Sequence, residues 1–299
     1  MDVYLAGVGP CIGTGGVLLE AQRRNMNVYL AGAESRTWCI DEYLSGRGRP
    51  LEVRNNRISG GVNNVGEKAH IPNDKAGNIN ILMSFYYIDD IVVRLIPRFK
   101  NFMLDSGAFT YLISGKHVDW DEYVSRYIAF IKEHKIEKFF ELDIDPLIGY
   151  EKAKKIRSRI EHETGKQCIP VWHRSRGKEE FFRMCDEYPY VAVGGIVSKE
   201  IKRAEYKYFP WFINQAHKRG AKIHGLGFTN LEGLKKYHFD SVDSSAWTAG
   251  NRFGFIYKFN GKGMSKFIKP AGYRVKAKET AINNFVEWVK FSQYAAKHY

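Results

Sequence analysis

The chain has 299 residues, 44% of them hydrophobic and 14% aromatic, so it can fill a sizeable core and is not an intrinsically disordered protein. Its 46 Lys and Arg against 33 Asp and Glu give a formal charge of +13, which indicates a polyanionic partner, nucleic acid ahead of an acidic membrane surface. A solubilising surface explains the charge about equally well. The four cysteines lack C-x-x-C spacing, so neither a zinc cluster, another metal site nor a disulfide framework is indicated.

The sequence also indicates where the protein works. The first residues lack the basic flank and long apolar stretch of a signal peptide, and no run approaches the roughly 18 apolar residues of a membrane span. We therefore expect a cytoplasmic protein with no membrane partner, and a host cytoplasm if the gene belongs to a phage.

The N-terminal segment has the pattern of a strand at 3–6, a helix from about Gly16 and a second strand at 28–31. The Gly-rich loop at 7–16 resembles a dinucleotide-binding fingerprint, and Glu34 is placed to bind a ribose. Its glycines do not follow the GxGxxG spacing, however, and Pro10 removes an amide from the turn. We therefore prefer a tight turn between strand and helix, and expect no cofactor.

A short helix is expected at 36–46, followed by a long loop at about 46–78 rich in Gly, Asn and Arg. The arginines of this loop either bind phosphates or are solvated surface charge, two readings of about equal weight. They are Arg47, Arg49, Arg54 and Arg57. The next segment, 79–90, is ambiguous between strand and helix.

From residue 102 onward, short apolar runs alternate with helical stretches, a pattern typical of a parallel sheet with helical crossovers. The runs are 102–105, 139–143, 168–173, 190–196, 222–228 and 239–243. Helices are expected from Asp119, whose side chain can cap the first turn, and at 150–164, 178–188, 207–219 and 230–237. Together with the two N-terminal strands, the six runs make the eight of an α/β (β/α)8 TIM-type barrel.

The alternation of apolar runs and helical stretches ends after Asp243. We expect a catalytic barrel domain over 1–250 and a C-terminal part over 251–299, in which a hairpin (252–259 and 265–268) and a helix (277–297) pack on the barrel. The hairpin is rich in aromatics and lysines, so its rings either stack on bases or pack on the barrel, and the sequence favours neither.

In such a barrel every polar strand ending lies at the same rim, where this fold places its chemistry. The rim residues are Asp105, Asp143, His173, Gly194, Gly195, His224 and Asp243. Two carboxylates facing one mouth are how glycosidic bonds are usually broken. A single strand-end aspartate is more often a helix cap, but several on one rim favour catalysis.

Four motifs in order resemble the tRNA-guanine transglycosylases. Asp105-Ser-Gly-Ala-Phe109 is similar to their DSGGF or DSGGY motif, and Val193-Gly-Gly-Ile196 to their base-binding GGL segment. Phe239-Asp-Ser-Val-Asp243 with Asn251-Arg252 is similar to the stretch that holds their nucleophile, and His224-Gly-Leu-Gly227 to their pocket-lining MGVG. The resemblance covers about residues 100–255.

The resemblance implies a role for each matching residue. Asp243 would be the nucleophile on C1′ and Asp105 the general acid/base, while Asp143, or Asp145 as the fallback, would read the purine edge. Gly194 and Gly195 would hydrogen-bond the base, and Phe109 and His224 would sandwich its ring. Asn251 and Arg252 would contact the nucleic acid. No cofactor is implied, because exchange of one base for another through a covalent sugar intermediate needs no redox or nucleotide energy.

Departures from the family pattern point to a different polymer. His173 stands where the family has a purine-reading glutamine, and the zinc cluster and most of the tRNA-binding subdomain are missing. A compact, zinc-less, basic chain resembles the phage and bacterial enzymes that insert 7-deazaguanine bases into DNA. We therefore expect a DNA-guanine transglycosylase, a pentosyltransferase that uses a free 7-deazaguanine such as 7-cyano-7-deazaguanine.

Three alternatives remain open. They are a tRNA-guanine transglycosylase with a reduced contact surface, a basic barrel that binds nucleic acid without catalysis, and a barrel enzyme acting on a small phosphorylated sugar with the Gly194-Gly195 pair as its phosphate loop. The acidic residues crowded at the same mouth weaken the last.

Overall fold

The computed structural model describes residues 26–33, 36–48, 50–54, 57–59, 78–114, 118–228, 230–268 and 276–299. The strand expected at 3–6, the Gly-rich loop, the helix expected from Gly16, Glu34 and Arg49 lie outside the described residues. So does most of the long loop, although a two-stranded antiparallel pair, β2 (Glu52–Arg54) and β3 (Arg57–Ser59), is described within it.

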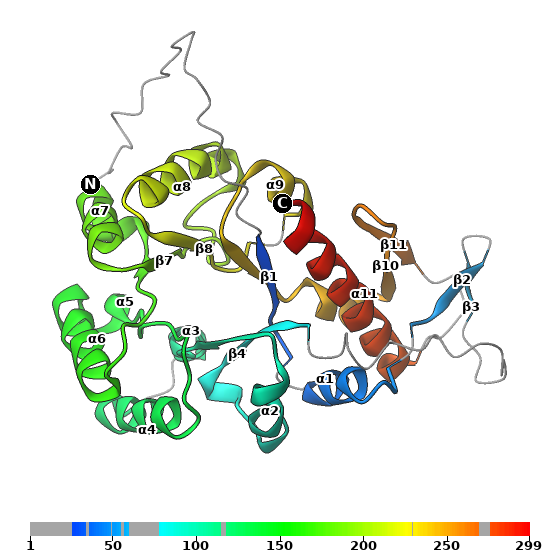
Figure 1. Cartoon of the computed structure of the whole chain (residues 1–299), viewed down its shortest axis with the longest axis horizontal. Helices are drawn as coiled ribbons and strands as arrows, with labels where there is room; N and C mark the ends of the chain where they lie inside the picture. The colour runs from blue at the N-terminus through cyan, green and yellow to red at the C-terminus, as the bar shows by residue number, and fades with distance from the viewer. Residues whose placement is uncertain are drawn as a thin grey trace, which may run out of the picture.

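At the centre lies a curled parallel sheet of seven strands, surrounded by helices (Figure 1). Its strands, in spatial order, are β5 (Asn101–Asp105), β4 (Asn80–Ser84), β1 (Asn27–Leu30), β9 (Ser241–Ser244), β8 (Lys222–Gly225), β7 (Tyr190–Val193) and β6 (Val171–Trp172). The first and last of them in sequence, β1 and β9, pair side by side from Asn27↔Ser241 to Leu30↔Ser244. Pairing of the first strand with the last is what curls the sheet back on itself.

Residues 139 and 140 join the two edges of this sheet. Isolated parallel bridges pair Leu104 of β5 with Phe139, and Phe140 with Ile169 next to β6. The strand expected at 139–143 is therefore present only as these bridges. The reason lies in Glu141, whose carboxylate accepts the Val171 amide at 2.7 Å in place of a backbone carbonyl, so the ladder stops there.

A buried ion cluster fixes this short connection. The Arg176 guanidinium contacts the Glu141 carboxylate at 2.5 Å and that of Asp145 at 2.6 Å, and the side chains of Arg176 and Glu141 are both 0% exposed. Arg157 approaches the other oxygen of Glu141 at 3.4 Å. Because such buried charges are tolerated only when they are paired, each member of the cluster depends on the others.

The segment at 79–90, which the sequence left ambiguous between strand and helix, contains a strand and the start of a helix. It forms strand β4, a 3₁₀ turn (Phe85–Tyr87) and the start of helix α2 (Asp90–Leu95), which Asp89 caps by accepting the Val92 amide at 2.9 Å. Strand β4 lies between β1 and β5, so the two neighbours of β1 are β4 and β9. The sequence had placed the segments 3–6 and 102–105 beside this strand, and in the structure β9 and β4 take these two places.

The other predicted helices form close to their expected bounds. They are α1 (Thr37–Leu44), α4 (Trp120–Glu133), α6 (Tyr150–Thr164), α7 (Gly177–Glu187), α8 (Phe209–Lys218) and α9 (Leu231–Lys236). Three short ones, α3 (Ala108–Ser114), α5 (Asp145–Ile148) and α10 (Ala249–Phe253), follow strand ends. Helix α4 begins as predicted, because Asp119 accepts the amides of Asp121 and Glu122 at 3.0 and 3.1 Å.

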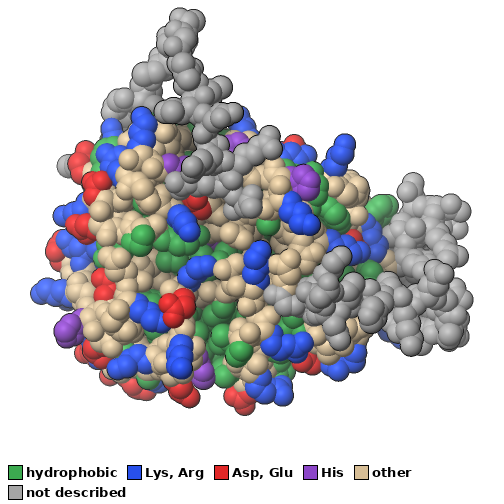
Figure 2. Space-filling view, viewed as in Figure 1, with side chains coloured by type: hydrophobic (Ala, Val, Ile, Leu, Met, Phe, Trp, Pro, Cys, Tyr) green, Lys and Arg blue, Asp and Glu red, His purple; other side chains and the backbone are tan. Residues whose placement is uncertain are grey.

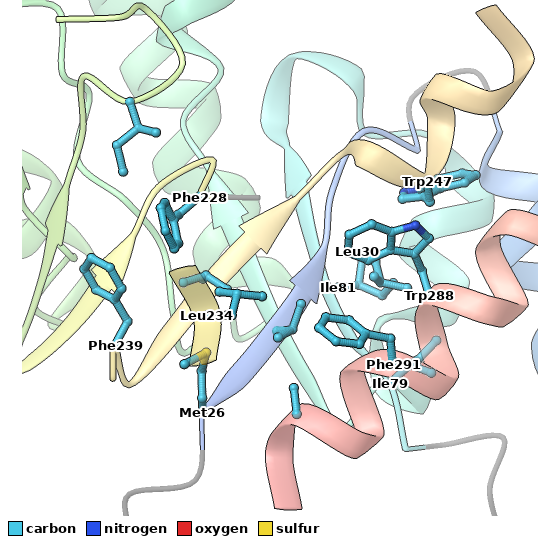
Figure 3. Close-up of a cluster of buried hydrophobic side chains, with 14 of the residues drawn as sticks. Met26, Leu30, Ile79, Ile81, Phe228, Leu234, Phe239, Trp247, Trp288 and Phe291 are labelled. Carbon is cyan, nitrogen blue, oxygen red and sulfur yellow. The ribbon is translucent and has the colours of Figure 1, made fainter. Parts of the chain in front are cut away.

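The last helix, α11 (Ala277–His298), lies against β1, α1 and the hairpin of β10 (Phe255–Phe259) and β11 (Met264–Ile268). Trp288 and Phe291 of α11 point toward Leu30 and Ile81 of the sheet and toward Ile79, which directly precedes β4 (Figure 3), and all five are at most 1% exposed. Burial of each such side chain contributes about 1.5–3 kcal/mol. The C-terminal part is thus an integral outer layer of the α/β core.

The hydrophobic core lies on both sides of the sheet. One cluster fills the inside of the curl, and its members come from nearly every strand: Tyr29, Ala31, Leu82, Met103, Phe140, Ile169, Val171 and Ala192. Larger clusters lie between the strands and the outer helices. None of the described helices is long and apolar enough to cross a membrane.

Candidate active site

The predicted site residues gather at the carboxyl ends of the strands. Asp105 is the last residue of β5, Asp143 follows the bridge at Phe140, and His173 follows β6. Gly194 follows β7, while Asp243 is the third residue of β9. Because the strands are parallel, these positions share one rim, as the alternation of elements had indicated.

Asp105 is the carboxyl group whose acidity the site changes most clearly. Burial raises its pKa to about 7, and the nearby charges of Asp143 and Asp243 act in the same direction. The amide of Gly107, 3.0 Å from Oδ2, opposes the shift. A carboxyl group with a pKa near neutrality can both give and accept a proton at physiological pH.

His173 joins two carboxylates. Its Nε2 lies 3.0 Å from Asp143 Oδ2 and its Nδ1 lies 3.3 Å from Glu200 Oε2. Burial disfavours the charged ring, but these two hydrogen bonds outweigh it and raise the pKa of His173 to about 9. The hydrogen bond from His173 in turn lowers the pKa of Glu200. At neutral pH the site therefore holds an imidazolium between two carboxylates.

Asp243 is held by a chain of buried hydrogen bonds. Its Oδ1 lies 2.5 Å from the Gly227 amide and 3.2 Å from His224 Nε2. The other ring nitrogen of His224 is 2.5 Å from the Ser241 hydroxyl, which also contacts the Tyr190 hydroxyl. One consistent proton order has Tyr190 donating to Ser241, Ser241 to His224, and His224 to Asp243. Burial raises the pKa of Tyr190 and keeps it a donor.

His224 is not placed as the sequence had suggested. Its side chain is fully buried inside the curl, next to the rings of Phe140 and Tyr29, with centroids 5.4 and 6.3 Å away. A base could not stack on this ring without displacing the side chains that bury it. The position favours support of Asp243 over the expected stacking role.

The two glycines pack against the His173–Glu200 pair. A Cβ on Gly194 would lie 2.6 Å from His173 Cε1, and one on Gly195, whose φ is +79°, would lie 2.8 Å from Glu200 Oε2. The Gly194 amide donates to Trp172 O and the Gly195 carbonyl accepts from Ile201, both at 2.9 Å. Among the described residues, the Gly194 carbonyl and the Gly195 amide have no hydrogen-bond partner, so these two groups are available to a base.

The two remaining base-binding candidates differ in environment. Phe109, at the start of α3, is 43% exposed, so its ring is accessible for stacking. Asp145 belongs to the buried ion cluster, and its hydrogen bond and charge interaction with Arg176 outweigh burial and lower its pKa. Asp143, bonded to His173, is therefore better placed than Asp145 to read a base.

The predicted nucleic-acid contacts are spread more widely. Arg47 is exposed and forms ion pairs with Asp41 and Glu42 at 2.9 and 3.6 Å, and of Arg54 and Arg57 the structure describes only the backbone. Asn251 donates to Ala277 O at 3.1 Å, while exposed Arg252 lies over the Phe253 ring at 5.7 Å. Figure 2 shows Lys and Arg side chains spread over one face of the molecule, with hydrophobic surface between them.

The hairpin aromatics mostly pack inward. The Tyr257 ring meets Trp288 edge-on at 5.5 Å, and Phe259 meets Phe291 at 6.4 Å. Lys266 lies over the rings of Phe255 and Tyr257 on the outer side, at 5.0 and 5.7 Å. Of the two readings that the sequence left open, the structure favours packing on the core for these rings.

Sequence reasoning missed Glu200, Ser241 and Tyr190. A signal existed for Ser241, because residues two apart on a strand share a face and Ser241 therefore points to the same side as Asp243. Glu200 lies in an irregular loop after Gly195, where neither periodicity nor spacing indicates direction. Within the described part of the chain, no group of three or more His, Cys, Asp or Glu side chains is arranged to hold a metal ion.

Comparison with known proteins assigns no family to the chain. No family model and no curated protein matches the chain. Among solved structures, it is similar to the carboxyl transferase domain of Rhizobium etli pyruvate carboxylase with 3-bromopyruvate (13% identity, TM-score 0.43) and with 3-hydroxypyruvate (14% identity, TM-score 0.41). Each match covers 92% of this chain and 49% of the other, so the chain spans about half the length of the structures it matches.

Proposed function

We propose that the protein is a DNA-guanine transglycosylase that exchanges guanine for a 7-deazaguanine base through a covalent aspartyl–sugar intermediate. The observation that supports this most strongly is the unequal pair of carboxyl groups at one rim. Asp105 has its pKa raised to about 7, while Asp243 receives hydrogen bonds from an amide and an imidazole. Two carboxyl groups in contrasting environments are what an acid and a nucleophile require.

The proposal includes a complete barrel. With residues 139–140 counted as a short strand between β5 and β6, the sheet has the eight positions of a (β/α)8 barrel. The order of the four sequence motifs that resemble transglycosylases then matches the order of strand ends around the mouth.

The first half of the reaction would break the bond to guanine. An Asp243 oxygen attacks C1′ and forms an ester bond, while the C1′–N9 bond breaks and its electron pair goes to the guanine, which takes the proton of Asp105. Both described hydrogen bonds reach Oδ1, so Oδ2 is the oxygen that would attack. In the second half, Asp105 removes the N9 proton of the incoming base, whose nitrogen attacks C1′ and releases Asp243.

The base would lie between Asp105 and the His173 pair. Asp143 would accept hydrogen bonds from the purine edge, and the Gly194 carbonyl and Gly195 amide would add an acceptor and a donor. Phe109 is accessible to stack on the ring. A guanine in duplex DNA cannot reach this depth while stacked, so the target must be flipped out or single-stranded.

The preference for DNA rests on the sequence, whose compact and basic character resembles the enzymes that insert 7-deazaguanine bases into DNA. The test is to incubate the protein with labelled guanine and, separately, DNA and tRNA, and to count the label in each polymer. Label in DNA supports the proposal, and label in tRNA alone would assign the same chemistry to the other polymer. A folded protein that labels neither would refute it.

The matched control for this test is Asp121→Asn. Asp121 is an exposed aspartate of the outer helix α4, whereas Asp243→Asn removes the proposed nucleophile. Exchange should disappear in Asp243→Asn and persist in Asp121→Asn. Retained exchange in Asp243→Asn would exclude Asp243 as the nucleophile.

A further inference from the structure

A second polar pocket opens beside β1 and β9, formed by the turns that follow these two strands. It has a volume of about 330 Å³ and is lined by Gly32, Arg36, Ser245, Thr248 and Arg252. The volume is at the lower end of the range of small-ligand sites, about 300–1,000 Å³.

The walls of the pocket are fixed to each other by one backbone and one side-chain hydrogen bond. The Ala31 amide donates to Ser244 O at 3.0 Å, and the Trp247 indole donates to Ala31 O at 2.7 Å. Gly32 has a φ of +77°, and a Cβ there would lie 2.7 Å from Ser245 Cβ. Glycine is thus needed for the two turns to approach, and the pocket is preformed.

The lining suits an anion with several acceptor oxygens. A guanidinium group presents a planar fork of donors that matches a phosphate group, and two such groups come from separate turns, Arg36 before α1 and Arg252 in α10. Ser245 adds a hydroxyl. Thr248 uses its hydroxyl to donate to Ser245 O at 2.8 Å, so it shapes the wall.

The pocket is also close to the proposed nucleophile. Ser245 is two residues after Asp243, so their Cα atoms are at most about 7 Å apart. In a nucleotide whose C1′ lies at Asp243, a flanking phosphate is bonded to the same sugar. The distance therefore allows one strand to occupy both places.

We propose that this pocket binds a backbone phosphate of the DNA strand next to the target nucleotide, and so positions C1′ on Asp243. This rests on the proposed function for its ligand. It assigns to Arg36, Ser245 and Gly32 a role in substrate binding, and it gives Arg252 a defined ligand. The site would add affinity without reading sequence, because phosphates carry no base information.

The experiment is equilibrium binding of a fluorescent single-stranded oligodeoxynucleotide at several salt concentrations, without any free base. The double variant Arg36→Gln/Arg252→Gln should bind about tenfold more weakly than the wild type. Its plot of log affinity against log salt should be shallower by about 0.7, the value for one phosphate in single-stranded DNA. Arg126→Gln, on the outer helix α4, is the control and should match the wild type.

A strand of the same sequence with neutral methylphosphonate linkages decides whether the phosphate is the group recognised. The wild type and the double variant should bind it equally. A persisting difference would mean that the arginines contact bases or sugars, and an unchanged salt slope in the double variant with charged DNA would also refute the site. Thermal unfolding of both variants controls for folding.

The outcome is separable from that of the proposed function, because no step of the assay depends on catalysis. A shallower salt slope in the double variant of a protein that exchanges no guanine would establish the phosphate site and reject the transglycosylase. Guanine exchange by a protein whose double variant keeps the full salt slope would support the transglycosylase and reject the phosphate site.

Discussion

Replacing His173 with glutamine should remove a part of the protein's stability that depends on pH. In the folded protein the pKa of His173 is raised from 6.5 to about 9 by Asp143 and Glu200, so the folded state binds this proton more tightly than the unfolded state does. The resulting stability is complete below pH 6.5 and is lost as the pH rises through about 9. Glutamine keeps a polar side chain but cannot carry the charge.

The size of the effect follows from the two pKa values. The shift from 6.5 to about 9 amounts to roughly 3 kcal/mol, at about 1.4 kcal/mol for each pH unit. Linkage then predicts that the contribution of His173 to the free energy of unfolding is roughly 3 kcal/mol at about pH 6, roughly 2 at about pH 7.5 and close to zero at about pH 9.5.

The assay is urea unfolding of the wild type and of His173→Gln across this pH range. The stability difference between the two proteins should shrink by about 3 kcal/mol from the acidic to the alkaline end. Other titrating groups affect both proteins and cancel in the difference. His162→Gln, at an exposed position of α6, should show no such trend. A difference between wild type and His173→Gln that is independent of pH would refute a charged His173.

Three further predictions concern the carboxylates and their supports. Asp105→Asn should abolish exchange yet stabilise the protein by roughly 2–4 kcal/mol at about pH 8, because the pKa of Asp105, raised from 3.8 to about 7, makes its ionised form costly in the folded state. Urea unfolding should show that this gain in unfolding free energy vanishes near about pH 3.5. Ser241→Ala should lower kcat with little change in KM, because it breaks the contact that orients His224; equal kinetics to the wild type would exclude that role. Glu141→Ala should cost about 3–5 kcal/mol in unfolding free energy, because buried Arg176 would keep only Asp145 as a charged partner and the Val171 amide would lose its acceptor; an unchanged unfolding midpoint would contradict this.

The elements with strong local signals were predictable. Helix α4 combines an Asp119 cap with an apolar stripe, and it begins within a residue of the expected position. The strands β7 and β8 lie between clear helices and were also found. In each case local preference and tertiary packing favour the same structure.

Two elements were harder to predict from the sequence, for different reasons: the connection at Phe139–Phe140 and strand β4. The first was expected as a full strand, but the Glu141 side chain replaces part of the ladder, and a side chain acting as a backbone partner leaves no periodic trace. The second shares a short apolar segment with α2, and a run of five residues fits strand or helix equally well.

The candidate site was predictable in its strand-end residues and less so in its contacts. Parallel strands place Asp105 and Asp243 at one rim whatever the loops do. The links from Glu200 to His173 and from Ser241 to His224 depend on loop paths and rotamers that only tertiary structure fixes. For the same reason the sequence could not show that His224 is buried.

The most direct test of the central claim is to trap the covalent intermediate. End-labelled DNA and the purified protein are mixed, denatured and separated by electrophoresis. We predict a labelled band at the mass of the protein–DNA adduct for the wild type, its release on adding excess guanine before denaturation, and no band for Asp243→Asn. A band that Asp243→Asn retains, or a wild type that exchanges bases without forming the adduct, would contradict the aspartyl–sugar mechanism.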